Sequence, residues 1–140
     1  MIVADASVVV ELLLRGDRAL LLDELLLGDE PVAVPHLLDL EVAQVLRRWA
    51  ARGALSAERA GQAVGDLADL PFSRQPHQPL LERVWQLRHR LTAYDAVYLA
   101  LAEVFEARLA TCDAALAAAA ADSVEVVVPA LGPDGEGAPR

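Results

Sequence analysis

Short apolar runs alternate along the chain with segments in which apolar residues recur every three or four positions. Runs of the first kind are typical of buried strands, and they occur at 1–4, 31–35, 71–73, 109–111 and 124–128. Segments of the second kind predict helices at 6–14, 17–27, 36–51, 56–70, 80–90, 113–121 and from 92 onward. This alternation predicts a three-layer α/β fold, in which helices flank a mostly parallel central sheet of four or five strands.

Residues with strong capping tendencies indicate where several helices begin and end. Asp17 is expected to cap the second helix, and Gly28 to follow its last turn as the C′ residue. Ser56 is expected to cap the helix that follows it, and Thr92 forms a capping box with Asp95 three positions later.

Leucine is concentrated in the first two predicted helices. The leucines concerned are Leu12, Leu13, Leu14, Leu20, Leu21, Leu22, Leu25, Leu26 and Leu27. They cover more than one stripe of a helix, so a single face of a sheet cannot bury them all. Two interpretations stay open: the surplus leucines dock another protein chain, or they fill a thick two-layer core.

The length and charge of the chain limit its class. At 140 residues it is long enough to bury about two thirds of the surface that its unfolded form exposes. We expect one domain over residues 1–131 and a disordered tail at 132–140. A net charge of −9 argues against broad electrostatic adhesion to nucleic acid or an anionic membrane. A local nucleic-acid site is not excluded, because acids that hold metal ions lower the total charge while they serve a phosphate substrate.

Three features bear on where the protein works. Cys112 is the only cysteine, which excludes an intramolecular disulfide and fits a reducing compartment. The predicted first strand begins at Met1 or Ile2, so no secretory leader is expected, and no apolar run approaches the length that spans a bilayer. We therefore expect a cytoplasmic protein that does not associate with membranes.

Four acidic residues are candidates for a functional site: Asp5, Glu41, Asp95 and Asp113. Each also has an ordinary structural explanation. Asp5 and Asp113 are good helix caps, and Asp95 completes a capping box. Glu41, on the inward face of its helix, can pair with an arginine. Together, however, they point to one place, because strand ends that lead into helices all lie at one edge of a parallel sheet.

Carboxylates gathered at this edge would repel one another. Two of them about 4 Å apart repel by about 4 kcal/mol at an effective dielectric constant near 20. Such a cluster therefore persists only with bound protons or a cation. Because all the ligands are oxygen atoms, the sequence predicts a site for Mg²⁺ or Mn²⁺.

Four stretches of the sequence carry a resemblance to a known family. They are Ile2-Val3-Ala4-Asp5-Ala6-Ser7, Leu40-Glu41-Val42, Leu109-Ala110-Thr111-Cys112-Asp113 and, most specific of all, Thr92-Ala93-Tyr94-Asp95-Ala96-Val97-Tyr98-Leu99-Ala100. In these stretches the chain resembles a PIN domain, and more narrowly the VapC-type ribonuclease toxins of bacterial type II toxin–antitoxin pairs. The resemblance covers nearly the whole chain except the tail.

The resemblance implies a metal site with Mg²⁺ or Mn²⁺, whose ligands are the four acids Asp5, Glu41, Asp95 and Asp113. Of these, Asp5 and Asp95 are expected as the principal ligands, and Ser7 and Thr111 as neighbouring polar positions. Some relatives carry a further acid a few residues past the last one, whereas residues 114–121 here supply none. Whether one ion or two are bound stays open.

The activity that the resemblance implies is metal-dependent hydrolysis of RNA phosphodiester bonds by an endoribonuclease toxin. Such a toxin is expected to form homodimers and to be neutralised by a cognate VapB-type antitoxin that lays apolar segments on its helices. The alternative is a catalytically inactive PIN fold that binds a protein partner or RNA.

Basic residues are candidates for contacts with the RNA, and all twelve of them are arginine. Arg88 and Arg90 precede the helix of Asp95, and further candidates are Arg47, Arg48 and Arg52. A solvated helical face is the more common explanation of such arginines. No ligand spacing is seen for the histidines, which are His36, His77 and His89.

The absence of lysine excludes two other α/β classes with acids at strand ends. A receiver domain of a phosphorelay needs a lysine beside its phosphoacceptor. A phosphatase of the haloacid dehalogenase type needs an Asp-x-Asp pair where Asp5-Ala6-Ser7 stands, and usually a lysine as well. P-loop and dinucleotide motifs are absent too, since the one Gly-x-Gly lies in the expected tail, at 135–137.

Overall fold

A five-stranded parallel sheet forms the centre of the fold in the computed structural model, which describes residues 1–130. The strand order is β3-β2-β1-β4-β5, and every neighbouring pair is parallel. The strands are β1 Ile2–Ala4, β2 Val32–Pro35, β3 Ser73–Gln75, β4 Arg108–Ala110 and β5 Val126–Val127. The predicted α/β class with a parallel sheet is confirmed. The domain end at 131 and the tail at 132–140 fall outside the described residues.

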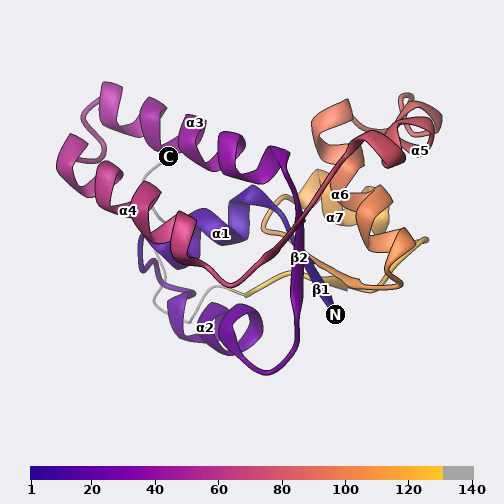
Figure 1. The fold of residues 1–140 in the computed structure, drawn as a ribbon, viewed down its shortest axis with the longest axis horizontal. Helices are drawn as coiled ribbons and strands as arrows, with labels where there is room; N and C mark the ends of the chain where they lie inside the picture. The colour runs from indigo at the N-terminus through magenta and orange to yellow at the C-terminus, as the bar shows by residue number, and fades with distance from the viewer. Residues whose placement is uncertain (131–140) are drawn as a thin grey trace.

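Helices form a layer on each side of this sheet (Figure 1). The helices are α1 Ala6–Leu13, α2 Ala19–Leu27, α3 Leu37–Ala51, α4 Ala57–Asp69, α5 Leu81–Gln86, α6 Ala93–Val104 and α7 Ala114–Ala120, with a 3₁₀ turn, η1, at Gln78–Leu80. Helices α1 to α4 lie on one side, and α5 to α7 lie on the other. This division follows from right-handed crossovers, because the chain moves across the sheet from β1 to β3 in one direction and from β3 through β4 to β5 in the other.

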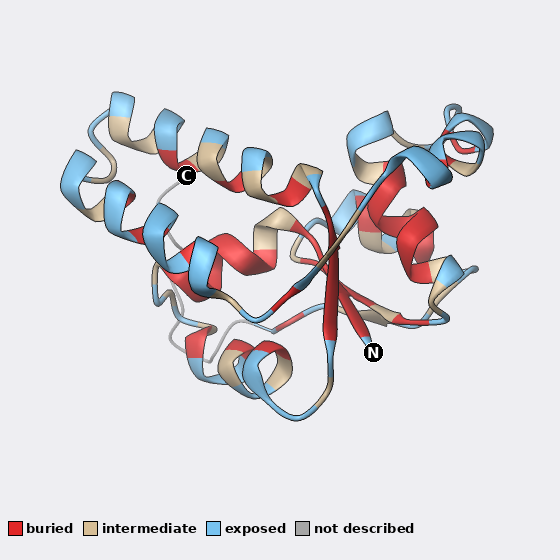
Figure 2. Ribbon diagram, viewed as in Figure 1, coloured by how far each residue is buried: buried red, intermediate tan, exposed pale blue. Residues whose placement is uncertain are grey.

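The core is centred on the inner strands and on α6 (Figure 2). Every residue of β1 and β2 is buried, as expected for strands covered on both faces. Helix α6 is buried without a break from Ala96 to Ala102 and contacts β1, β2 and β4. Its alanines at 96, 100 and 102 let the helix lie close to the sheet. The first turn of α6 is thereby fixed next to the carboxyl ends of the central strands.

The leucine-rich helices divide between core and surface. Leu12, Leu13, Leu22 and Leu26 are buried in the core. On α2, however, Leu20 is 81% exposed, Leu21 46% and Leu27 45%. The leucines of the first group fill the core, whereas the exposed leucines of α2 leave the docking interpretation as a prediction. No helix within residues 1–130 is both long enough and apolar enough to cross a membrane.

The expected caps of α2 are wrong. Asp17 does not cap this helix, which has Arg18 at its N-cap position without any side-chain cap bond. The turn before α2 is set instead by Arg15, whose φ is 54°, and by an ion pair between Arg18 and the buried Glu11. Gly28 is the C-cap residue with φ −77°, not a left-handed C′ residue. A glycine is needed at position 28 for a steric reason instead, because an added Cβ would lie 2.5 Å from the Glu24 carbonyl oxygen.

Two other boundaries differ from the prediction for tertiary reasons. Strand β3 lies two residues later than expected, because its pairing with β2 joins Ala33 to Ser73 and Pro35 to Gln75. Helix α5 ends at Gln86, and the chain continues to Arg90 in turns. Neither the register with β2 nor the end of α5 is marked by a local breaker.

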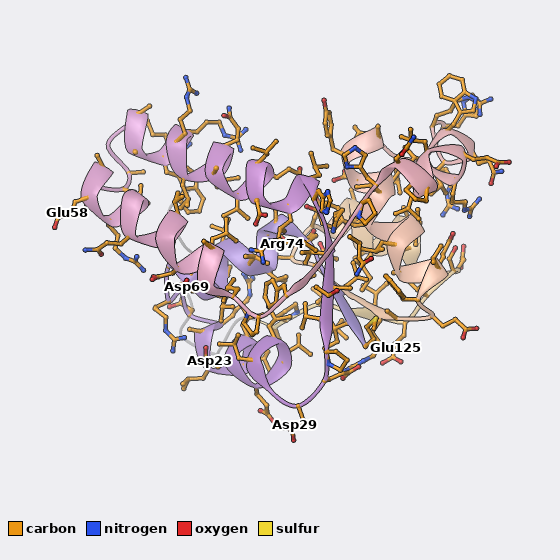
Figure 3. All side chains as sticks on the ribbon, in the orientation of Figure 1. Asp23, Asp29, Glu58, Asp69, Arg74 and Glu125 are labelled. Atoms are coloured by element: carbon orange, nitrogen blue, oxygen red, sulfur yellow. The ribbon has the colours of Figure 1, made fainter. Side chains whose placement is uncertain are left out.

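An arginine on β3 fastens the α3–α4 pair to the sheet. Arg74 forms a bidentate salt bridge with Asp39 of α3, with distances of 2.8 Å from Nε to Oδ2 and 3.0 Å from Nη2 to Oδ1. Its Nη2 also donates to the Leu67 carbonyl oxygen of α4 at 2.8 Å. One side chain therefore links β3, α3 and the end of α4 (Figure 3).

We predict that Arg74→Ala lowers the free energy of unfolding by about 1 to 2 kcal/mol, because the charge-assisted bonds of a partly exposed group to Asp39 and to backbone carbonyl oxygens are lost. Urea unfolding followed by circular dichroism measures the change. Arg47→Ala is the matched control on the exposed side of α3 and should change stability by less than about 0.5 kcal/mol. Equal stability of the two variants would contradict the linking role of Arg74.

Candidate active site

The four candidate acids come from four separate segments near one edge of the sheet. Asp5 directly follows β1, and Asp113 lies three residues after β4. Glu41 lies in α3, which follows β2, and Asp95 lies in the first turn of α6. Strands β2 and β4 are the two neighbours of β1, so their carboxyl ends meet at its end. Several other acids lie on the outside of the molecule, as Asp29, Glu58 and Glu125 show (Figure 3).

Asp5 is buried, with 5% of its surface exposed, and caps α1. Its Oδ1 accepts bonds from the Ser7 backbone N–H at 3.0 Å and from the Val8 N–H at 3.3 Å. The Ser7 hydroxyl donates to the same oxygen at 2.5 Å, and the Thr111 hydroxyl donates to Oδ2. Burial raises the pKa of this carboxyl, and these hydrogen bonds oppose the rise. Oδ2 accepts one bond and keeps further acceptor capacity.

The two hydroxyls that hold Asp5 also fix the loop after β4. Ser7 Oγ accepts from the Cys112 backbone N–H at 2.8 Å, and Thr111 Oγ1 accepts from the Asp113 N–H at 2.9 Å. Each hydroxyl therefore donates to a carboxylate and accepts from a backbone amide. This arrangement ties Asp113 to Asp5 although 108 positions separate them in the sequence.

Glu41 is half-buried and has a tyrosine as its hydrogen-bond partner. The Tyr98 hydroxyl donates to Glu41 Oε1 at 2.6 Å. Burial raises the pKa of Glu41, and the negative charges of Asp95 and Asp5 raise it further, while the bond from Tyr98 opposes the rise. Burial likewise raises the pKa of Tyr98 far above its usual value, with the Glu41 carboxylate as the next cause. Glu41 is thus close enough to Asp5 and Asp95 for their charges to act on it.

Asp95 and Asp113 lie at the starts of α6 and α7. The Asp95 backbone N–H donates to Thr92 Oγ1 at 3.2 Å, which is one half of the expected capping box. Burial raises the pKa of Asp95, and the charge of Asp113 raises it further. Asp113 is exposed and caps α7, with its Oδ1 accepting from the Leu116 N–H at 3.0 Å. The capping explanation is therefore correct for Asp113. Asp113 caps α7 and at the same time is near enough to Asp95 for its charge to raise the pKa of that carboxyl.

None of these four acids takes part in an ion pair within residues 1–130; the pairs found there join other residues. Their mutual repulsion is therefore not balanced by any arginine of the described chain. Their hydrogen-bond donors are instead neutral hydroxyl and backbone N–H groups. Neutral donors orient a carboxylate without cancelling its charge, so the site keeps a local negative potential that favours a cation.

The donor chemistry fits a hard divalent cation. In the described part of the chain, no three acidic, histidine or cysteine side chains are close enough together to surround one ion as they stand. Mg²⁺ does not need such a closed set, because it commonly binds one or two carboxylates and keeps several waters. Asp5 Oδ2 accepts a single hydrogen bond and the Asp95 carboxylate oxygens accept none from the described residues, so both acids have oxygens that could bind such an ion. Glu41 and Asp113 suit contacts made directly or through water.

The arginines considered from the sequence lie in two places. Arg88 stacks over the Trp85 ring, 4.6 Å from its centre, and Arg90 donates to the Ala119 carbonyl oxygen at 2.5 Å. Arg48, on α3, lines a surface hollow of about 420 Å³ together with Glu41. Sequence reasoning did not distinguish Arg48 from its neighbours, although a position seven residues after Glu41 on one helix indicates the same face.

Tyr98 is the site residue that sequence reasoning missed. It stands in the most specific block of the sequence, yet its position three residues after Asp95 was not assigned a role. The sequence does contain an indication of its role, because a tyrosine on the buried side of a helix needs a hydrogen-bond partner for its hydroxyl. The histidines are all exposed.

We predict that Asp95→Asn stabilises the protein at pH 7 when a chelator removes divalent ions. The pKa of Asp95 is raised in the folded state, so its ionised form opposes folding above that pKa. As pH falls and the carboxyl binds its proton, this opposition disappears. The excess in melting temperature of Asp95→Asn over wild type should therefore shrink towards about pH 4. A variant less stable than wild type at pH 7 would contradict this.

Comparison with known proteins supplies independent information on the chain. A family model described as PIN domain matches residues 2–122. Ribonuclease VapC1 of Mycobacterium tuberculosis is 45% identical over 120 residues, which cover 84% of this chain and 89% of that protein. The crystal structure of Mycobacterium tuberculosis VapC20, described as a Sarcin-Ricin loop cleaving toxin, has a TM-score of 0.69 and 21% identity, and covers 92% of this chain and 100% of that one.

A second solved structure is VapBC2 of Rickettsia felis bound to a DNA fragment from its promoter, with a TM-score of 0.66, 13% identity and coverage of 91% of this chain and 98% of that one. At these identities the two structures show a shared fold alone. The family model and the similarity to VapC1 both extend over most of the chain. The chain therefore belongs to the PIN domain family, with VapC ribonucleases as its relatives.

Proposed function

We propose that this protein is a metal-dependent endoribonuclease toxin of the VapC type, neutralised by a cognate antitoxin. The observation that carries the proposal is that the four acids stand on segments that follow β1, β2 and β4 or begin α6, and that none has an ion-pair partner among the described residues. A cluster of this kind is costly unless a cation compensates it. The similarity to ribonuclease VapC1 supports RNA as the substrate.

The side chains divide into two roles. Asp5 Oδ2 and Asp95 would hold Mg²⁺ or Mn²⁺ most directly, and Glu41 and Asp113 would act directly or through bound water. When bound, the ion would activate a water molecule and offset negative charge on the scissile phosphate. Ser7 and Thr111 keep Asp5 in a fixed orientation, which maintains the same geometry in each catalytic cycle.

Arginine would bind the RNA backbone. Arg48 is best placed, because it lines the same hollow as Glu41 and carries a guanidinium suited to phosphate. Arg88 and Arg90 remain candidates for more distant contacts, although both make bonds within the protein. With so few basic groups near the site, we expect recognition of a short stretch of RNA rather than general adhesion.

The partner proposal rests on exposed apolar side chains and on charge. Leu20, Leu21 and Leu27 of α2 lie on the surface, and the net charge of −9 favours a basic partner. An antitoxin with apolar segments would cover these leucines. A homodimer also belongs to this proposal. So does a cytoplasmic location, because an RNA-cleaving toxin needs access to cellular RNA and the single cysteine fits a reducing compartment.

We predict that Asp5→Asn and Asp95→Asn each reduce Mg²⁺-dependent cleavage of RNA by at least about 100-fold, because each variant removes a negative ligand. A fluorescent RNA substrate with Mg²⁺ or with EDTA measures the rate, and circular dichroism checks that each variant is folded. Asp29→Asn is the matched control, since Asp29 lies on the outside of the molecule (Figure 3) and should leave the rate unchanged.

Equal cleavage by wild type and both site variants would indicate a contaminating nuclease and contradict the proposal. Absence of cleavage by a folded wild-type protein that binds RNA or a partner would favour the alternative, a catalytically inactive binding module. The assay therefore separates the two functions that the sequence leaves open.

We predict that Leu20→Gln weakens binding of the antitoxin by about tenfold, because it removes an apolar contact worth roughly 1.4 kcal/mol. The probe is the product of the neighbouring reading frame, provided that it is a small basic protein that binds the wild type, and isothermal titration measures its affinity. Val104→Gln is the control, since Val104 is a similarly exposed apolar residue on α6. Equal weakening by both variants, or none by Leu20→Gln, would contradict α2 as the docking surface.

A further inference from the structure

Tyr98 is a buried tyrosine whose hydroxyl meets a carboxylate of the candidate site. Only 1% of its surface is exposed, whereas Tyr94, the other tyrosine, is 63% exposed. Its hydroxyl donates to Glu41 Oε1 at 2.6 Å, and no second hydrogen bond of this hydroxyl occurs within residues 1–130. This bond links the middle of α6 to α3 across 57 positions of sequence.

The hydroxyl is not needed to fill space. A phenylalanine would occupy the same cavity in the core, and burying a hydroxyl costs free energy unless it has a partner. Here the partner is a carboxylate that faces the charges of Asp5 and Asp95. Without a donor at Oε1, repulsion from these two acids would turn the half-buried Glu41 side chain towards solvent. The bond from Tyr98 opposes that rotation.

We propose that Tyr98 is a positioning residue that holds Glu41 in the site and leaves Oε2 as its oxygen for a divalent cation or a water bound to it. This inference rests on the proposed metal-dependent function and adds to it a residue outside the set of acids. Oε1 accepts the bond from the hydroxyl, whereas Oε2 accepts no hydrogen bond from the described residues and is therefore the less engaged oxygen of Glu41. The neutral phenol orients the carboxylate and leaves its charge available to the metal.

The effect of Tyr98 on metal binding must act through Glu41, which a double-mutant cycle tests. We compare wild type, Tyr98→Phe, Glu41→Ala and the double variant by isothermal titration with Mn²⁺, in the absence of RNA. Tyr98→Phe should weaken Mn²⁺ binding by about tenfold, as is typical when the partner of a metal ligand is removed. In the Glu41→Ala background, the same substitution should change the affinity less than twofold.

A matched control separates the hydroxyl from its location on α6. Tyr94→Phe removes a hydroxyl one turn earlier on the same helix, where no side-chain bond of Tyr94 occurs among the described residues, and should leave Mn²⁺ affinity unchanged. Melting temperatures in EDTA test the contact without metal. There, Tyr98→Phe should lower the melting temperature more when Glu41 is present than in the Glu41→Ala background.

Three results would overturn the inference. Tyr98→Phe could bind Mn²⁺ as tightly as a wild type that does bind it, which would leave the proposed function standing. It could weaken binding equally with and without Glu41, which would mean that it acts through general packing. Failure of the folded wild-type protein to bind Mn²⁺ would refute both this inference and the proposed metal-dependent function.

Discussion

The burial of carboxylates near one another is the constraint on which the architecture of the site depends. A parallel sheet brings the ends of its strands and the starts of the following helices to one edge, and in this chain Asp5, Glu41, Asp95 and Asp113 occupy such positions. The pKa of Asp5, of Glu41 and of Asp95 is raised chiefly by burial, so the fold keeps these groups where ionisation is unfavourable. A protein of this size is stable by only about 5 to 15 kcal/mol, and such a cluster is retained where binding a cation compensates it.

The surroundings of the acids explain how they stay in place without losing their charge. Ser7, Thr111 and Tyr98 each donate a hydroxyl hydrogen to a carboxylate, and none of the three is charged. An arginine in their place would hold the acids more strongly but would neutralise the potential that attracts a metal ion. The ion pairs of the molecule serve structure elsewhere, as the bond between Arg74 and Asp39 does for the α3–α4 pair. Neutral hydroxyl groups thus orient the acids of the site, while the ion pairs that stabilise the fold lie in other parts of the described chain.

Local sequence rules predicted most of the fold and failed where tertiary contacts decide. The period of apolar residues indicated every strand and helix, and the caps at Ser56 and Asp113 are formed by their own side chains. Asp17 failed as a cap because the preceding turn is shaped by the buried pair of Glu11 and Arg18, which no local rule contains. Glu41 was correctly placed on an inward face, but its partner Tyr98 is 57 positions away and is reached only after the sheet has formed. The sequence thus predicts the acids and, through the resemblance, Ser7 and Thr111 beside them, while the role of Tyr98 is seen only in the structure.

A divalent ion bound between Asp5 and Asp95 is the central element of the proposed function. Diffraction from crystals soaked in Mn²⁺, collected at a wavelength where manganese scatters anomalously, locates such an ion without reference to activity. We predict an anomalous peak within about 2.5 Å of Asp5 Oδ2 and of an Asp95 carboxylate oxygen, with water completing the ligand shell. The absence of a peak at this edge of the sheet in crystals that show Mn²⁺ elsewhere would contradict the account.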